Sequence, residues 1–338
     1  MPVEPGEVQL MMGVQKRVRA LSDVVCGDIS ELYKMGSELG FGRFSTVRAA
    51  ESLGTGKRFA LKVVENESLN DDENLVALEQ EVKILRMLEH PYVVKLKEVV
   101  TTPDRTYLSM ELLNGGELFE KIVEVGSFPE PEAAVVFARL VAAVDFLHAR
   151  DVVHRDLKPE NILFVEGKER IPTDIKVIDF GYAGIWSADA QLTGLCGTPD
   201  YVAPEILSWY DVTAETPGVA YGKPSDVWSL GVLLYVLLSG CAPFAADEED
   251  ELLRKVAAAQ YAFPEREWRA VSADAKDLIA RALVGDPAKR ITLAEVKEHA
   301  WCKAAVQSVA AELKASGVGR TAVRTRRDDS GACECLVQ

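Results

Sequence analysis

The chain has 338 residues, 48% of them apolar, which is enough for one large domain or two lobes with a sizeable core. The formal net charge of −15 argues against nucleic acid as a partner of the main body. An acidic surface suits basic peptides as partners, although it can equally serve solubility alone.

The six cysteines show no metal-binding spacing, and a chain of this size needs no disulfide frame. We therefore expect free thiols in a reducing cytosol. No apolar signal core stands next to a cleavage site at the N-terminus. The most apolar run, residues 232–238, is far shorter than the roughly 20 residues needed to span a bilayer. We predict a helix buried on all sides at this run.

Residues 1–32 are predicted to form an N-terminal extension. Within it, Lys16, Arg17 and Arg19 stand beside apolar residues. This pattern is typical of a short amphipathic helix and also of a loosely packed tail, and both interpretations stay open.

Residues 39–47 follow an apolar–polar alternation and predict the tip of a hairpin. Gly40 and Gly42 would let the backbone approach phosphate oxygens, because no side chain stands in the way. A dinucleotide-binding fold would need a helix directly after these glycines. Residues 59–64 instead predict a second strand, which argues against that fold.

Lys62 lies in the middle of this apolar strand, where a cation is costly unless it is paired. Residues 74–88 place leucine and valine on one face at helical spacing, so a helix should follow the strand. Glu81 borders that face and is the predicted partner of Lys62. Glu79 is the competing candidate, which the spacing disfavours.

Further elements are expected on both sides of the middle of the chain. Residues 93–99 and 106–110 predict two strands joined by a turn. Residues 130–148 predict an amphipathic helix that supports the loop following it.

The loop that follows carries the chemistry. Residues 154–161 are His-Arg-Asp-Leu-Lys-Pro-Glu-Asn, and Asp-Phe-Gly begins at Asp179. Phosphoryl transfer from a nucleotide requires metal ions on the phosphates, charge stabilisation and a carboxylate that orients the attacking hydroxyl. Asp156 is the candidate base, and Lys158 would lie over the transferring phosphate. Asn161 and Asp179 offer the oxygen ligands that magnesium takes.

These two motifs resemble the catalytic loop and metal loop of the protein kinases. The resemblance covers residues 33–301 and implies an α+β fold of two lobes, with ATP and Mg²⁺ bound between them. The small lobe, residues 33–110, would be an antiparallel sheet with one helix. Residues 111–116 would form a hinge, residues 117–301 a mainly helical large lobe, and residues 302–338 a C-terminal tail.

The resemblance also implies the nucleotide contacts. Met110 would lie at the back of the adenine pocket, and the carbonyl of Glu111 and the amide of Leu113 would bond the adenine edge. Glu117 would meet the ribose or a substrate arginine, or would be only a solvated residue of a first helical turn. Ser45 replaces the third glycine usual in the family and is small enough for that place. The residues expected around ATP are Leu39, Gly40, Phe41, Gly42, Arg43, Phe44, Ser45, Thr46, Val47, Ala60, Lys62, Glu81, Met110, Glu111, Leu113, Glu117 and Leu163.

The implied activation segment precedes Thr198, which together with Lys158 resembles serine/threonine kinases rather than tyrosine kinases. Arg155, next to the candidate base, usually has a phosphate partner when a kinase is switched by phosphorylation. Related kinases often place the phosphorylated threonine where this chain has Gly194, and Thr193 is one residue earlier. We expect activity to depend only weakly on Thr193.

Two further contacts and one insertion are expected in the large lobe. By resemblance, Asp226 would hydrogen-bond the backbone of the catalytic loop, and Arg290 would pair with Glu205. Residues 208–223 are longer than the family usually has at this place and predict a surface insertion.

Residues 114–119 and 299–301 resemble the calcium/calmodulin-dependent kinase group. The function implied is transfer of the γ-phosphate of ATP to Ser/Thr hydroxyls of protein substrates by a monomer in the cytoplasm. Glu117 and Glu160 suggest basic residues upstream of the acceptor. One alternative is a kinase-fold scaffold without activity, and another is a small-molecule or lipid kinase. The complete set of motif residues argues against the first, and Lys158 against the second.

Residues 303–338 carry a net charge of +2 against −17 for the remainder. Residues 304–315 are predicted to form a helix, at which a calmodulin-type inhibitory segment is conceivable. Gly317 and Gly319 interrupt the pattern, and no bulky aromatic anchor is present. Calmodulin binding is therefore the less favoured interpretation.

The chain ends in Cys335-Leu-Val-Gln, which fits a farnesylation box. Cys333 could take a second lipid, and upstream arginines could meet anionic headgroups. Because one lipid alone anchors poorly, both signals would be needed for membrane association. The alternative is a frayed terminus with chance cysteines.

Overall fold

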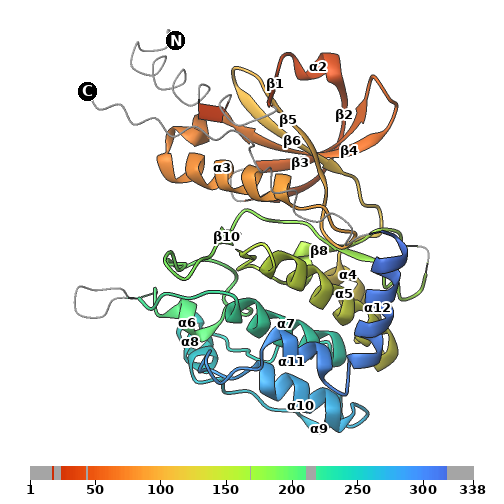
Figure 1. Cartoon of the computed structure of the whole chain (residues 1–338), viewed down its shortest axis with the longest axis vertical. Coiled ribbons are helices and arrows are strands. Elements are labelled where there is room, and N and C mark those ends of the chain that lie inside the picture. The colour runs from red at the N-terminus through yellow and green to blue at the C-terminus, as the bar shows by residue number, and fades with distance from the viewer. Residues whose placement is uncertain (1–16, 19–23, 43–44, 168, 211–217, 318–338) are drawn as a thin grey trace, which may run out of the picture.

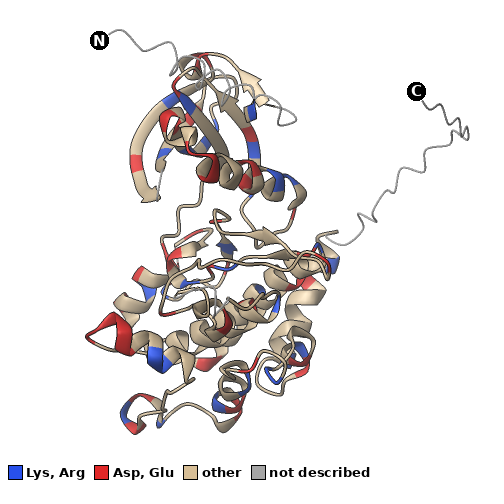
Figure 2. Cartoon of the chain, turned by 90° about the vertical axis from the view of Figure 1, so that its left-hand side faces the viewer, with Lys and Arg blue, Asp and Glu red and all other residues tan. Residues whose placement is uncertain are grey.

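The computed structural model describes residues 17–18, 24–42, 45–167, 169–210 and 218–317. This part of the chain folds into two stacked lobes, a small one built on a sheet and a large, mainly helical one (Figure 1). The predicted fold class is therefore confirmed. Acidic residues are spread over both lobes (Figure 2). Among the described residues, no helix is both long enough and apolar enough to span a membrane.

The small lobe contains a six-stranded sheet in the order β1-β5-β6-β4-β3-β2. Its strands are β1 (Val24–Cys26), β2 (Tyr33–Gly42), β3 (Ser45–Ser52), β4 (Arg58–Glu65), β5 (Leu96–Thr101) and β6 (Arg105–Glu111). All neighbours pair antiparallel except β1, which pairs parallel with β5. Strand β1 and the short helix α2 (Ile29–Leu32) come from the segment expected to precede the domain, so the sheet has one strand more than the sequence indicated.

Helix α3 (Asp72–Met87) follows the 3₁₀ helix η1 (Asn66–Asn70) and lies beside the sheet (Figure 1). It begins two residues before the predicted start because Asp71 caps it, accepting a hydrogen bond from the backbone amide of Glu73. Its apolar face is buried, which confirms the periodicity of this segment, and the buried apolar residues are Leu75, Leu78, Val82, Ile84 and Leu85.

The large lobe consists mainly of helices: α4 (Leu118–Val125), α5 (Glu130–His148), α6 (Pro204–Leu207), α7 (Pro224–Ser239), α8 (Glu249–Ala257), α9 (Glu265–Trp268), α10 (Ala273–Ala282), α11 (Leu293–Glu298) and α12 (Lys303–Ala315). Two small ladders and one 3₁₀ turn carry its loops: β7 (Val152–Val153) with β10 (Gly184–Ile185), β8 (Ile162–Phe164) with β9 (Ile175–Val177), and η2 (Pro159–Asn161). Every residue of α7 from Ser225 to Leu238 is buried, as predicted for its apolar run.

Helix α12 confirms the helix predicted at the start of the tail. It packs against α5, with Val309 only 2% exposed. Glu312 lies 3.4 Å from the guanidinium of Arg139, which belongs to α5. The first part of the tail is therefore built onto the large lobe.

A buried ion pair joins α6 to the segment that precedes α11 in the large lobe. Arg290 donates two hydrogen bonds of 2.8 Å to the carboxylate of Glu205, as expected. Its side chain is fully buried and also donates to the carbonyls of Pro224 and Val284. The guanidinium thus connects α6, the start of α7 and the residues that follow α10.

Replacing Arg290 by Met should lower the free energy of unfolding by about 3–5 kcal/mol, because the Glu205 carboxylate would stay buried without its partner. Urea-induced unfolding measures the loss. The control is Arg281→Met, which breaks the exposed pair with Asp277 and should cost at most about 1 kcal/mol. Equal losses in the two variants would contradict the structural role given to Arg290.

Candidate active site

Lys62 on β4 meets carboxylates from two other elements. Its Nζ lies 2.6 Å from Glu81 Oε1 on α3 and 3.6 Å from Asp179 Oδ1 in the Asp-Phe-Gly loop. Burial lowers the pKa of Lys62, but Glu81 and Asp179 raise it more, so the net pKa is above its usual value. The ammonium therefore stays charged and is placed at the junction of the two lobes.

Of the two acidic candidates on α3, Glu81 is the partner of Lys62, as predicted, and Glu79 is not. Glu81 binds Lys62, whereas Glu79 accepts two hydrogen bonds from the guanidinium of Arg17, at 3.1 and 2.9 Å. Arg17 also reaches Asp72 at 3.0 Å. This contact of Arg17 was not predicted, although the basic residues beside apolar ones in the N-terminal extension were a signal for it.

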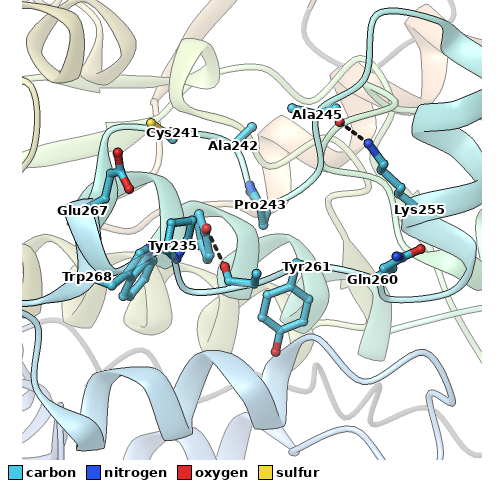
Figure 3. Close-up of a pocket in the computed structure, with 12 residues that line it drawn as sticks. Tyr235, Cys241, Ala242, Pro243, Ala245, Lys255, Gln260, Tyr261, Glu267 and Trp268 are labelled. Atoms are coloured by element: carbon cyan, nitrogen blue, oxygen red, sulfur yellow. Dashed lines mark hydrogen bonds between the residues drawn. The ribbon is translucent and has the colours of Figure 1, made fainter.

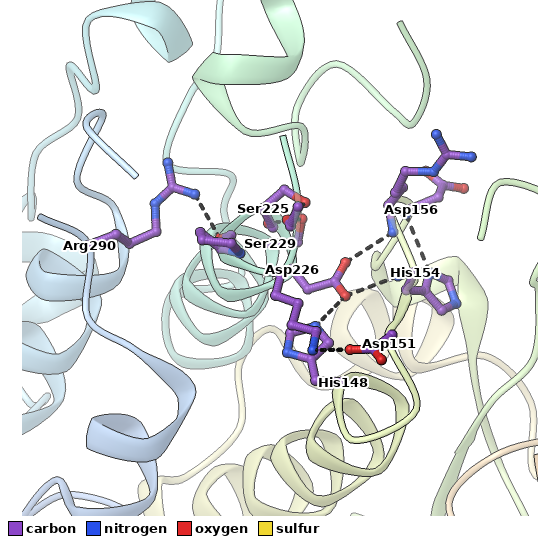
Figure 4. A network of polar contacts seen from close by, with 12 residues as sticks. His148, Asp151, His154, Asp156, Ser225, Asp226, Ser229 and Arg290 are labelled. Atoms are coloured by element: carbon purple, nitrogen blue, oxygen red, sulfur yellow. Dashed lines mark hydrogen bonds and ion pairs between the residues drawn. The ribbon is translucent and has the colours of Figure 1, made fainter. Parts of the chain in front are cut away.

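The catalytic loop is fixed by one buried carboxylate from α7 (Figure 4). Asp226, fully buried, accepts hydrogen bonds of 3.0 Å from the backbone amides of His154 and Arg155. His148 of α5 lies 2.8 Å from the same carboxylate. Burial raises the pKa of Asp226, but His148 and the amide of Arg155 lower it more, so the net pKa is below its usual value. The expected contact of Asp226 is confirmed.

Three of the predicted side chains meet at the carboxylate of Asp156. The amide nitrogen of Asn161 donates to its Oδ2 at 2.9 Å, and the hydroxyl of Thr198 donates to its Oδ1 at 2.9 Å. Lys158 Nζ lies 3.1 Å from Oδ2 and 2.7 Å from the Thr198 hydroxyl. The carboxylate orientation is thus determined by the catalytic loop and by the segment that carries Thr198.

Asp179 lies near both lysines. Burial raises the pKa of Asp179, but Lys62, the amide of Gly181 and Lys158 lower it more, so the net pKa lies below its usual value. Because Asn161 uses its amide nitrogen on Asp156, its amide oxygen is the atom that can face a cation. The described residues hold no group of three or more His, Cys, Asp or Glu suited to a metal. A magnesium ion at Asn161 and Asp179 would take its other ligands from phosphates and water, which suits this ion.

The predicted nucleotide contacts surround the same junction. Strands β2 and β3 form the expected hairpin, with Gly42 paired to Ser45, while Arg43 and Phe44 lie outside the described residues. Ala60 pairs with Met110 in the sheet. The half-buried apolar residues of this set are Val47, Ala60, Leu113 and Leu163. Leu39 and Phe41, also in this set, are 49% and 78% exposed. The backbone of Glu117 forms an isolated β-bridge with Leu163.

A separate cavity of about 540 Å³ lies on the large lobe between the end of α7, α8 and α9 (Figure 3). Aromatic residues Tyr235, Tyr261 and Trp268 form much of its wall. None of the predicted site residues line it. It is therefore not part of the site at Asp156.

Comparison with known proteins agrees with this geometry. The family model described as "Protein kinase domain" matches residues 33–302. The chain belongs to the protein kinase family. It is 40% identical over 276 residues to "Myosin light chain kinase A" of Dictyostelium discoideum, covering 82% of this chain and 90% of that protein. It is 41% identical over 274 residues to "Calcium/calmodulin-dependent protein kinase type 1B" of Rattus norvegicus, covering 81% of this chain and 76% of that protein.

This kinase is a serine/threonine protein kinase similar to the calcium/calmodulin-dependent group, as the sequence motifs indicated. Its domain implies ATP and a divalent metal ion. These findings favour catalysis over the scaffold alternative. Cys333 and Cys335, predicted lipid sites, lie outside the described residues.

Replacing Glu81 by Gln should lower kcat/KM by at least about tenfold, because Lys62 would lose a charge-assisted hydrogen bond that holds it in place. Steady-state kinetics with ATP and a peptide measure the effect. The matched control is Glu79→Gln on the same helix, which affects only the Arg17 contact and should change kcat/KM by less than about threefold. A larger loss in the Glu79 variant would contradict the assignment.

Proposed function

We propose that this kinase transfers the γ-phosphoryl group of Mg²⁺-bound ATP to serine and threonine hydroxyls of protein substrates, and that Asp156 orients these hydroxyls. The observation that supports this most is the convergence of Lys62 from the small lobe with Asp179, whose carboxylate also interacts with Lys158 of the catalytic loop. Positioned charges of this kind are the main protein contribution to phosphoryl transfer.

In the proposed step, the acceptor hydroxyl oxygen bonds to the γ-phosphorus while the bond to the β–γ bridging oxygen breaks and ADP leaves. Asp156 orients the hydroxyl and receives its proton, and Lys158 stabilises charge on the transferring group. Lys62 binds the α- and β-phosphates. Magnesium, which Asn161 and Asp179 would hold, supplies neutralisation of the phosphate charge.

Replacing Asp156 by Ala should lower kcat by about 10²–10⁴, since positioned proton transfer contributes that much. ATP affinity, measured by fluorescence titration, should stay within about twofold, because the phosphates are bound by other side chains. Equal turnover in the variant and the wild type would instead favour the scaffold alternative.

We propose that the substrates carry arginine or lysine upstream of the acceptor. Burial raises the pKa of Glu117, and the negative charges of Glu120 and Glu160 raise it further. Glu117 and Glu160 therefore repel each other. One carboxylate oxygen of Glu160 is buried and has no hydrogen-bond partner among the described residues. A guanidinium placed between these carboxylates would satisfy that oxygen and relieve the repulsion.

Peptides with arginine upstream should be preferred over alanine peptides by about tenfold in kcat/KM, and Glu117→Gln should reduce this ratio by about fivefold. The ratio should fall as the pH is lowered, and it should do so at a higher pH than an ordinary glutamate would require, because burial, Glu120 and Glu160 raise the pKa of Glu117. Parallel assays of both peptides measure it.

The control for this experiment is Glu124→Gln, an exposed residue of α4 paired with Lys121, which should leave the ratio unchanged. A ratio near one would exclude this substrate preference, and a ratio independent of pH and of Glu117 would exclude Glu117 as its cause.

We further propose a monomer in the cytoplasm. Lipidation at Cys335 and Cys333, and the membrane association that depends on it, stay predictions. Calmodulin binding stays the less favoured interpretation of the tail. It gains support from the name of the type 1B relative, while the packing of α12 against α5 argues against it.

A further inference from the structure

The guanidinium of Arg155, the residue beside Asp156, is already hydrogen-bonded in this structure. Its Nε donates to the carbonyl of Tyr182, at the start of the activation segment. Its Nη1 donates to the hydroxyl of Tyr221 at 3.2 Å. Tyr221 comes from the returning end of the insertion expected between residues 208 and 223.

The same hydroxyl also contacts the activation segment. Tyr221 Oη lies 2.9 Å from the carbonyl oxygen of Gly194 and 3.3 Å from that of Thr193. A phenol has one proton to donate and lone pairs to accept with, so it can donate to a carbonyl while it accepts from Arg155. Burial raises the pKa of Tyr221, and Cys196 beside it raises the pKa further, so the hydroxyl keeps its proton.

Backbone hydrogen bonds hold the Tyr221 side chain beside the activation segment. Tyr221 and Leu192 exchange two backbone hydrogen bonds of 3.0 and 3.1 Å, and Tyr221 is only 5% exposed. Next to it, Lys223 pairs with Asp151 at 2.6 Å. At Gly222 any side chain would clash, because a Cβ would come within 2.5 Å of the Trp186 indole nitrogen. The strand-like segment that carries Tyr221 is therefore held against the activation segment by the pairing with Leu192 and by the close approach of Gly222 to Trp186.

A short path leads from this contact to the base. Gly197 packs against the backbone of Arg155, so closely that a Cβ at Gly197 would lie 2.6 Å from the carbonyl oxygen of Arg155. The next residue, Thr198, donates its hydroxyl to Asp156 at 2.9 Å. A shift of the segment away from Arg155 would therefore move the group that orients the base.

We propose that the Tyr221 hydroxyl performs the task of an activation-segment phosphate, linking Arg155 to the backbone at Gly194 and so making this kinase active without phosphorylation of that segment. Tyr221 is thus a positioning residue that acts on Asp156 through Arg155 and Thr198. The position where related kinases carry the threonine is a glycine here and has no hydroxyl to modify. A phosphate holds Arg155 by its negative charge, whereas the Tyr221 hydroxyl holds it by a hydrogen bond and also donates to a carbonyl of the activation segment. The inference rests on the kinase activity stated above.

The first test uses the full chain, treated with a phosphatase and shown by mass spectrometry to carry no phosphate. We expect this protein to keep its kcat within about twofold, and Thr193→Ala to behave in the same way. Loss of most activity on dephosphorylation, regained when Thr193 is phosphorylated, would overturn the proposal. A wild-type protein inactive in every state would instead contradict the kinase activity itself.

The second test is Tyr221→Phe, which removes only the hydroxyl. Its kcat should fall by about tenfold, the effect of one hydrogen bond to a charged group, with KM for ATP unchanged within about twofold. This split distinguishes positioning of the base from a general loss of structure, which would lower the fraction of active enzyme together with the unfolding midpoint.

The matched control is Tyr210→Phe, an identical change at an exposed tyrosine of the same insertion, which should leave kcat unchanged. Wild-type kcat in Tyr221→Phe would overturn the proposal, as would equal losses in the two tyrosine variants. Because the phosphatase test needs no substitution, the proposal stays falsifiable even if Tyr221→Phe does not fold.

Discussion

The site depends on one buried anion, the carboxylate of Asp226. A fully buried charge is tolerated only where hydrogen bonds satisfy it, and here two backbone amides of the catalytic loop and His148 do so. The loop can therefore adopt only the path that brings its amides to α7, including the left-handed backbone of Arg155 at φ 70°. Since α7 is buried along most of its length, the loop that carries Asp156 is anchored to a helix in the core of the large lobe.

The small lobe reaches this frame through α3. Two glutamates that are two residues apart, and so lie on different faces of that helix, have separate tasks, since Glu81 holds Lys62 and Glu79 holds Arg17. Because Lys62 also lies 3.6 Å from Asp179, the position of α3 is coupled to the relative position of the lobes. The arginine that precedes the domain thus contacts the element on which the lysine depends.

Sequence reasoning succeeded where spacing is local and failed where contact is long-range. Helical periodicity predicted α3 and α5 within two residues. The motif at 154–161 placed Asp156 and Asn161 in one loop, and the structure joins them by a hydrogen bond. Strand β1 was missed because three residues are too few for an alternation to be recognised. Tyr221 was missed because nothing near it in sequence shows that it lies against Arg155, 66 residues earlier.

The seating of the tail helix has a thermodynamic consequence. Val309 is buried and Glu312 is paired with Arg139, so α12 is already occupied as a ligand of its own domain. Any molecule that competes for the apolar side of α12 can bind only when this helix is detached from α5. The apparent affinity of such a molecule is its intrinsic affinity multiplied by the fraction of time that the helix is detached. Any change that strengthens the packing of α12 against α5 therefore raises the concentration at which such a competitor binds.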